Sequence, residues 1–154
     1  MKPNYLLIPL ATVVTALGGS WITDRGMNWY RAINLPAWTP AGSIIGAVWT
    51  VLFVLATIAA LLIYNLIPKG KKRRQIMWAF LANAVLNVLW SGLFFGWHLS
   101  GWAIIEAMVL ALSVLVLIIL IWPKSKAAAV MLMPYFAWVC FAAHLTYSVW
   151  LLNK

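Results

Sequence analysis

The sequence predicts an all-α membrane protein built as a bundle of five transmembrane helices. The first observation is composition: of 154 residues, 66% are hydrophobic and 8% are charged, whereas a soluble domain carries about 25% charged residues. The second is the length of the apolar runs, because a helix needs about 20 apolar residues to cross about 30 Å of hydrocarbon. The third is the placement of the cations, most of which lie between these runs.

Five segments are long and apolar enough to cross a bilayer. The predicted spans are 5–23, 43–67, 76–97, 101–122 and 128–151. Pro68 with Gly70, the polar stretch "HLSG" and the stretch "PKSK" separate the later spans. The chain is therefore predicted to form a single domain over residues 1–154.

The net charge of +9 is concentrated in the predicted turns. Five of the eleven cations lie in "PKGKKRRQ" at 68–75, a cluster typical of a cytoplasmic loop. Its expected partner is the lipid bilayer, through anionic headgroups. Nucleic acid is not an expected partner, because binding it requires a basic soluble surface.

The distribution of cations between the two sides predicts the orientation. With five spans, Lys2, the 68–75 cluster, Lys124 and Lys126 place eight cations on one side, and the other side holds three. Positive residues favour the cytoplasmic side. We therefore expect a multi-pass protein with a cytoplasmic N-terminus and an external C-terminus.

Three predicted spans present aromatic residues on one face beside small or amide residues, at helical spacing. These faces are Gly46, Trp49, Phe53 and Ala56 in the second span; Asn83, Asn87, Trp90 and Phe94 in the third; and Tyr135, Trp138 and Ala142 in the fifth. Two asparagines in hydrocarbon need partners on other helices or a cavity to line. The spacing is compatible with helix packing, with Asn as an interhelical link, and with an aromatic-walled pocket for a planar ligand.

Glu106 is the only acid within a predicted span. It is a functional candidate, or equally an interhelical hydrogen-bond partner. Cys140 and His144 lie one helical turn apart, but no third ligand follows at matching spacing, so no metal site is expected. The two acids lie in different segments and no phosphate loop or nucleophile elbow occurs. Conventional catalysis is therefore not expected.

Several motifs together resemble the translocator protein, or tryptophan-rich sensory protein (TspO), family, also known as TspO/MBR or the peripheral-type benzodiazepine receptor family. They are "WYRAINLPAWTP" in the unusual segment 28–42, "VWTVLF", "NAVLNVLWSGLFF", "GWAIIE" and "PYFAWVCFAAHLTYSVW". These motifs together cover nearly the whole chain, and they occur in the same order as in the family. It implies a five-helix membrane protein that binds porphyrins (protoporphyrin IX or heme) without a covalent link, as a homodimer.

The resemblance also implies a pocket under the first loop. Residues carried over by motif to line or cover it are Trp29, Tyr30, Trp38, Trp49, Phe53, Asn87, Trp90, Trp138 and Ala142. The segment 28–42 would then be a lid, stiffened by Pro36 and Pro40, whose rings fix φ.

The function implied by the resemblance remains open between three classes. A porphyrin-binding sensor or regulator is the first expectation. A light- and oxygen-dependent protoporphyrin-degrading enzyme is the second, with Trp29 and Trp138 as the reactive indoles. A transporter of porphyrins or other hydrophobic molecules is the third. Leu151 stands where animal members carry the cation of a cholesterol motif, which argues against cholesterol and favours a prokaryotic member in the cell membrane.

Overall fold

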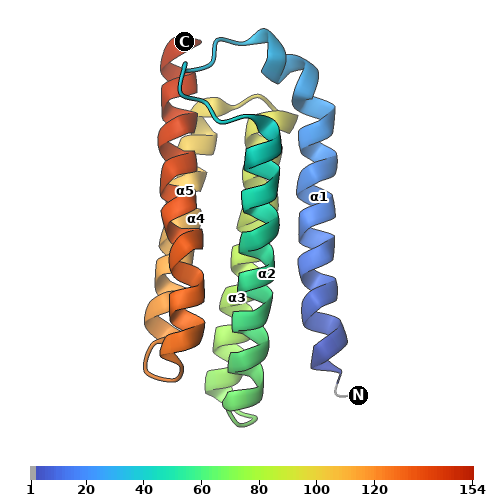
Figure 1. The fold of residues 1–154 in the computed structure, drawn as a ribbon, viewed down its shortest axis with the longest axis vertical. Helices are drawn as coiled ribbons and strands as arrows, with labels where there is room; N and C mark the ends of the chain where they lie inside the picture. The colour runs from blue at the N-terminus through green and yellow to red at the C-terminus, as the bar shows by residue number, and fades with distance from the viewer. Residues whose placement is uncertain (1–2) are drawn as a thin grey trace.

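The computed structural model describes residues 3–154 as a bundle of long helices (Figure 1). In chain order they are α1 (Asn4–Ala32), α2 (Gly42–Leu66), α3 (Lys71–Ser91), the π-helical turn η1 (Gly92–Gly96), α4 (Ser100–Ile121) and α5 (Lys126–Leu152). Over the described residues, five helical segments (α1, α2, α3 continued through η1, α4 and α5) are long and apolar enough to span a membrane. The chain is an integral, multi-pass membrane protein of the predicted fold class.

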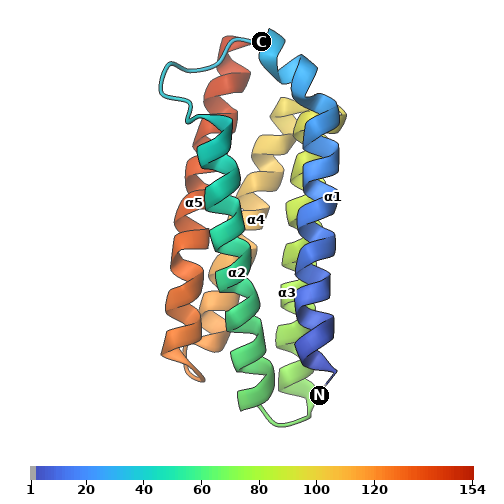
Figure 2. The same cartoon turned by 45° about the vertical axis from the view of Figure 1, so that its right-hand side comes forward.

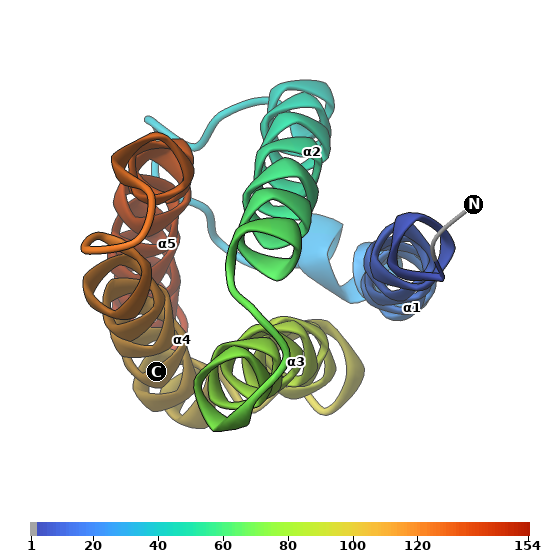
Figure 3. The same cartoon turned by 90° about the horizontal axis from the view of Figure 1, so that it is seen from below.

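The helices run alternately up and down, because each connection between them is short (Figures 1 and 2). The α1–α2 loop and the η1–α4 connection lie at the end that holds the C-terminus. The α2–α3 and α4–α5 turns lie at the opposite end. Seen from that end (Figure 3), α5 packs on α2 and α4, while α1 packs on α2, α3 and η1 at the edge of the bundle.

The core consists of two buried clusters at different levels of the bundle. The larger one joins α2, α3, α4 and α5 around residues such as Ile63, Leu117 and Leu132. The smaller one centres on Phe94 and Phe95 of η1 and reaches the last turns of α1. Helix α1 buries few side chains, and the Thr12 and Thr57 hydroxyls, 2.7 Å apart, link it to α2.

The boundaries of α1 differ from the prediction. The helix continues to Ala32, nine residues beyond the predicted end of the first span, so 28–32 of the predicted lid are helical and the loop itself is 33–41. Ile33 already has an extended backbone, with φ −89° and ψ 161°. Pro36 prevents the helix from resuming at Leu35, because the residue before a proline avoids the helical region. The third span also differs from its predicted bounds of 76–97. Helix α3 begins at Lys71 and continues into η1, which ends at Gly96.

Candidate functional site

A polar network lies inside the bundle where α3, α4 and α5 meet. The Tyr135 hydroxyl donates to Asn83 Oδ1 at 3.0 Å and accepts from Asn87 Nδ2 at 3.2 Å. Asn83 Nδ2 also donates to the Ser113 hydroxyl at 2.8 Å. Asn83, Asn87 and Tyr135 are all buried, so these bonds satisfy groups that would otherwise be costly in hydrocarbon. The amide face of the third span therefore links helices.

A groove of about 650 Å³ runs between α2 and α5. Its lining residues are Ala47, Val48, Val51, Leu52, Pro134, Ala137, Trp138 and Phe141. Small or β-branched residues on α2 face a wall of aromatic and small residues on α5. Val51 and Ala137 are exposed, so the groove opens sideways toward the bilayer. Its volume lies within the 300–1,000 Å³ typical of small-molecule sites.

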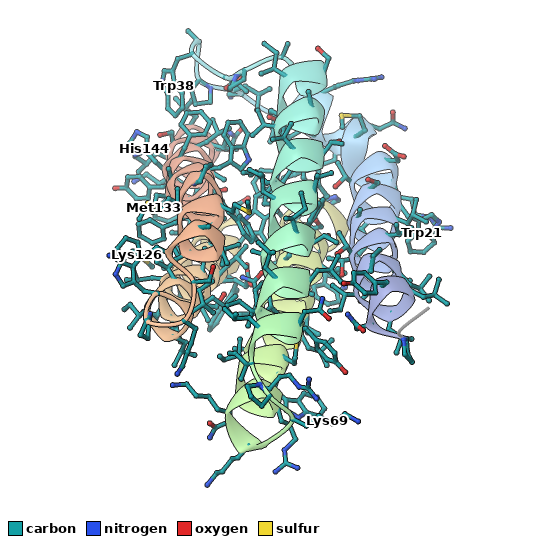
Figure 4. All side chains as sticks on the ribbon, turned by 60° about the horizontal axis from the view of Figure 1, so that its bottom comes forward. Trp21, Trp38, Lys69, Lys126, Met133 and His144 are labelled. Atoms are coloured by element: carbon teal, nitrogen blue, oxygen red, sulfur yellow. The ribbon has the colours of Figure 1, made fainter. Side chains whose placement is uncertain are left out.

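The α1–α2 loop contacts the groove wall at the end of the bundle that holds the C-terminus. Trp38 stacks on His144 (ring centroids 5.4 Å apart, planes at 17°) and meets the edge of Phe141 at 5.9 Å. Phe141 in turn lies 5.1 Å from Trp138. Figure 4 shows Trp38 and His144 at the same end of the molecule. A continuous aromatic path thus connects the loop to the groove wall.

Asn153, directly after α5, holds the beginning of the same loop. Its side-chain Oδ1 accepts from the Asn34 backbone N–H at 2.9 Å, and its Nδ2 donates to the Asn34 carbonyl at 2.8 Å. The Nδ2 also donates to Val149 in the last turn of α5, at 2.7 Å. The loop is therefore fastened to α5 by its backbone at Asn34 and by its side chain at Trp38.

Trp29 and Tyr30 lie in helix α1 and not in the α1–α2 loop. They belong to the last turns of α1 and pack around Phe94, with centroids at 5.5 and 6.1 Å. Trp90 stacks on the same ring at 5.4 Å. These residues form an aromatic cluster on η1, and none of them lines the groove. The resemblance suggested that Trp29 and Tyr30 belong to a loop, and the structure places both in a helix.

Buried side-chain atoms without hydrogen-bond partners mark three positions in the described residues. They are the indole nitrogens of Trp90 and Trp138 and both carboxyl oxygens of Glu106. An unpaired buried donor costs about 1–3 kcal/mol. Trp138 is the one of the three that also lines the groove. The sequence leaves two roles open for Glu106, and one of them is interhelical hydrogen bonding. Its carboxyl group has no hydrogen-bond partner within residues 3–154.

Apart from Ala142, the predicted site residues fall into three groups. Asn83, Asn87 and Tyr135 form the polar network, and Trp49 touches it through Tyr135 at 6.0 Å. Phe53 packs on Trp49 at 5.6 Å, and Ala142 is half-buried. Trp38 and Trp138 belong to the groove and its cover, while Trp29, Tyr30, Trp90 and Phe94 form the η1 cluster.

Sequence reasoning missed two features of the site. The first is the set of small groove residues, although Ala47 and Val51, or Pro134, Ala137 and Phe141, recur at helical spacing. The second is the pair of histidines. His144 stacks on Trp38, and His98, with a φ of 57°, stacks on Trp29 at 4.2 Å. Within residues 3–154 no three metal-ligating side chains converge, so Cys140 and His144 gain no third ligand.

These features define a class: a multi-pass helical membrane protein with an aromatic-walled groove between two helices and a loop that contacts one wall of this groove. The chain matches the TspO/MBR family over residues 6–151. It is 34% identical over 153 residues to the tryptophan-rich protein TspO of Bacillus cereus, covering 99% of each chain. It is 31% identical over 146 residues to the tryptophan-rich protein TspO of Archaeoglobus fulgidus, covering 94% of this chain and 93% of that one.

A mammalian relative also aligns over nearly its full length. The chain is 29% identical over 160 residues to the translocator protein of Sus scrofa, covering 100% of this chain and 94% of the relative. The family match and these full-length alignments agree with the five observed helices. The chain belongs to the TspO/MBR family.

Proposed function

We propose that the chain binds porphyrins and similar planar hydrophobic molecules within the membrane and acts as a sensor or regulator. The observation that carries the proposal is the groove between α2 and α5, which has an aromatic wall at Trp138 and Phe141 and a volume of about 650 Å³. Flat aromatic ligands gain both buried apolar area and ring stacking in such a site. The lateral opening supports entry from the bilayer, where a hydrophobic ligand partitions.

The Trp138 indole supports a ligand that carries a hydrogen-bond acceptor. Its N–H is buried and has no partner among the described residues. A carboxylate, carbonyl or ring nitrogen of a ligand seated in the groove would satisfy this donor. Porphyrins combine such acceptors with a planar apolar ring.

The α1–α2 loop supports a regulatory role. Its Trp38 touches Phe141, which lines the groove, so a ligand that displaces Phe141 would also move the loop. A change inside the membrane would then alter the surface at the outer end of the bundle. A partner protein at that surface could respond to ligand occupancy.

Filling the groove tests the binding site. Val51→Trp would occupy the groove, and Val54→Trp is a matched control because Val54 is exposed on the same helix but does not line the groove. Titration with protoporphyrin IX in lipid nanodiscs should show about tenfold weaker binding for Val51→Trp. A lost ring contact costs about 0.5–1.5 kcal/mol beyond the lost apolar burial, and about 1.4 kcal/mol corresponds to tenfold. Equal affinity in both variants would exclude this groove as the site.

A light-dependent degradation of the bound pigment is a second candidate, favoured by the oxidisable indole of Trp138 at the groove wall. Porphyrin and light would supply the reactivity, and the protein would orient the pigment. Illumination of the purified complex followed by mass spectrometry of the pigment distinguishes the two. A covalently changed pigment indicates an enzyme, and an unchanged pigment a binding protein.

We also propose that the end holding the α2–α3 and α4–α5 turns is cytoplasmic, since it carries most of the cations. Lys2, which contributed to the count, lies outside the described residues. In a Cys140→Ser background, Gly70→Cys should resist an impermeant thiol reagent in intact cells, and Ala37→Cys should react. Both positions are exposed. The reverse pattern would invert the orientation.

A further inference from the structure

One end of the bundle carries a large charge that the chain itself does not balance. The cations described there are Lys69, Lys71, Lys72, Arg73, Arg74, Lys124 and Lys126. The only two acids in the chain are Asp24, near the outer end of α1, and Glu106, in the second turn of α4. The start of α4 and the C-terminal half of α1 lie toward the opposite end of the bundle (Figure 1). The counter-charge must therefore come from another molecule.

A pocket of about 430 Å³ lies among these cations, between the α2–α3 and α4–α5 turns. Its lining combines apolar residues with lysines: Leu66, Ile67, Pro68, Gly70, Lys71, Lys72, Pro123 and Lys124. Lys71 and Lys72 begin α3, and Lys124 lies in the α4–α5 turn, about fifty residues later in the chain. The bundle thus brings three lysines to the lining of one concave site.

The basic residues at this end differ in what they already bind. Arg73 donates to the backbone carbonyls of Tyr64 at 3.3 Å and Ile67 at 3.4 Å, and its guanidinium lies 4.4 Å from the Tyr64 ring centre. It therefore closes the end of α2. The three lining lysines are exposed and have no acid to pair with at this end of residues 3–154, so they are free for a ligand.

Neighbouring residues place the pocket at the level of lipid headgroups. Trp122, next to the lining residue Pro123, is 40% exposed, and Trp78 on α3 is 62% exposed. Exposed tryptophans near helix ends favour the membrane–water interface. The apolar part of the lining, at Leu66 and Pro123, can contact the glycerol and upper acyl region of a lipid, which a small soluble anion lacks.

We propose that this pocket binds the phosphate group of an anionic phospholipid from the adjacent leaflet, held by Lys71, Lys72 and Lys124. The site is independent of the porphyrin groove, which lies between α2 and α5 farther along the bundle. Lysine supplies point charges that attract a phosphate from several directions. The start of α3 at Lys71 adds free backbone N–H groups and the positive end of its dipole, and it has no side-chain cap.

Native mass spectrometry of the full chain in neutral detergent can test the site directly. The wild type should retain phosphatidylglycerol in preference to phosphatidylcholine. The triple variant Lys71→Gln, Lys72→Gln, Lys124→Gln should bind phosphatidylglycerol about 100-fold more weakly, because each lysine near an anionic headgroup contributes about fivefold. Lack of preference between the two lipids in the wild type would overturn the proposal.

A second triple variant with the same loss of charge is the matched control. Lys69→Gln, Arg74→Gln, Lys126→Gln removes three cations from the same end that do not line the pocket. Its affinity should stay within about fivefold of wild type. Equal losses of phosphatidylglycerol affinity in both triple variants would show diffuse attraction to the basic surface. That result would refute the proposed binding in the pocket.

Two further measurements complete the test. Inorganic phosphate at millimolar concentration should not displace the lipid, and full displacement would assign the site to a soluble anion instead. Circular dichroism on each variant checks folding. If the lining triple variant does not fold, Lys124→Gln alone, in the α4–α5 turn, should lower phosphatidylglycerol binding about fivefold, and wild-type binding in that variant would refute the proposal.

Discussion

Removal of the Trp38 side chain should loosen the α1–α2 loop without unfolding the bundle. Trp38 is 46% exposed, so it contributes little to the core. Its two aromatic contacts, with His144 at 5.4 Å and Phe141 at 5.9 Å, are worth about 0.5–1.5 kcal/mol each. Trp38→Ala should therefore cost the closed loop about 1–3 kcal/mol, which corresponds to about 5- to 150-fold more frequent opening.

Two assays on one preparation measure this effect. Amide hydrogen exchange should accelerate in residues 33–41 and stay slow in the helices. Protoporphyrin IX should bind about tenfold more weakly, mainly through faster dissociation, as is usual when a contact is lost. Trp102→Ala is the matched control, because Trp102 is 64% exposed near the same end and has no described aromatic contact with the loop.

The result that would refute this reasoning is a well-folded Trp38→Ala protein with unchanged exchange in 33–41 and an unchanged dissociation rate. A lower melting temperature with unchanged affinity would instead show that Trp38 only anchors the loop in the lipid interface. In that case the aromatic path from Trp38 through Phe141 to Trp138 would have no role in ligand retention.

Three other substitutions should separate the parts of the structure. Gly26→Ala should lower the free energy of unfolding by about 1–3 kcal/mol and the melting temperature with it, because a Cβ there would overlap the backbone of η1. Gly18→Ala is the control, because a Cβ at Gly18 would meet only side-chain atoms at 3.9 Å. Equal melting temperatures of the two variants would contradict this prediction. Asn153→Ala should speed hydrogen exchange in 33–41 by about 5- to 150-fold, since it removes the two exposed hydrogen bonds to the Asn34 backbone, worth about 0.5–1.5 kcal/mol each. Asn153→Asp, which keeps the acceptor, should lie in between, and wild-type exchange in Asn153→Ala would show that Asn153 does not hold the loop. Trp138→Phe should reduce any light-driven change of bound protoporphyrin more than Trp29→Phe, because of these two residues only Trp138 lines the groove. Mass spectrometry of the illuminated pigment measures the fraction changed. A larger reduction in Trp29→Phe would place the reactive site at the η1 cluster.

Composition and apolar length were sufficient to predict the five helices, because the cost of unpaired backbone groups in lipid leaves a helix as the form that such runs adopt. Spacing also predicted that Asn83 and Asn87 share an inward face. Their partner Tyr135 lies 52 residues from Asn83 and 48 residues from Asn87. Periodicity describes one helix at a time, so it could not choose between a helix link and a pocket wall.

The end of α1 and the groove show a different limit. The dense prolines and aromatics of 28–42 predicted a loop, but Trp29 and Tyr30 are kept helical by packing on η1, a contact with a segment more than sixty residues later. Weighting aromatic residues also drew attention away from small ones such as Ala47 and Ala137, which make room for the groove. The groove is the space left between the side chains of two packed helices, so the sequence of either helix alone does not predict it.

The fastening of Asn34 by Asn153 has a consequence for the order in which the protein matures. The two residues are 119 positions apart, so α1, the loop and α2 are synthesised and inserted well before the residue that holds the loop exists. Contacts of such long separation form late, after the local ones. We expect the loop to remain accessible to proteases throughout biogenesis and to become protected when α5 enters the membrane. Protection of 33–41 would therefore report that the last helix has been inserted.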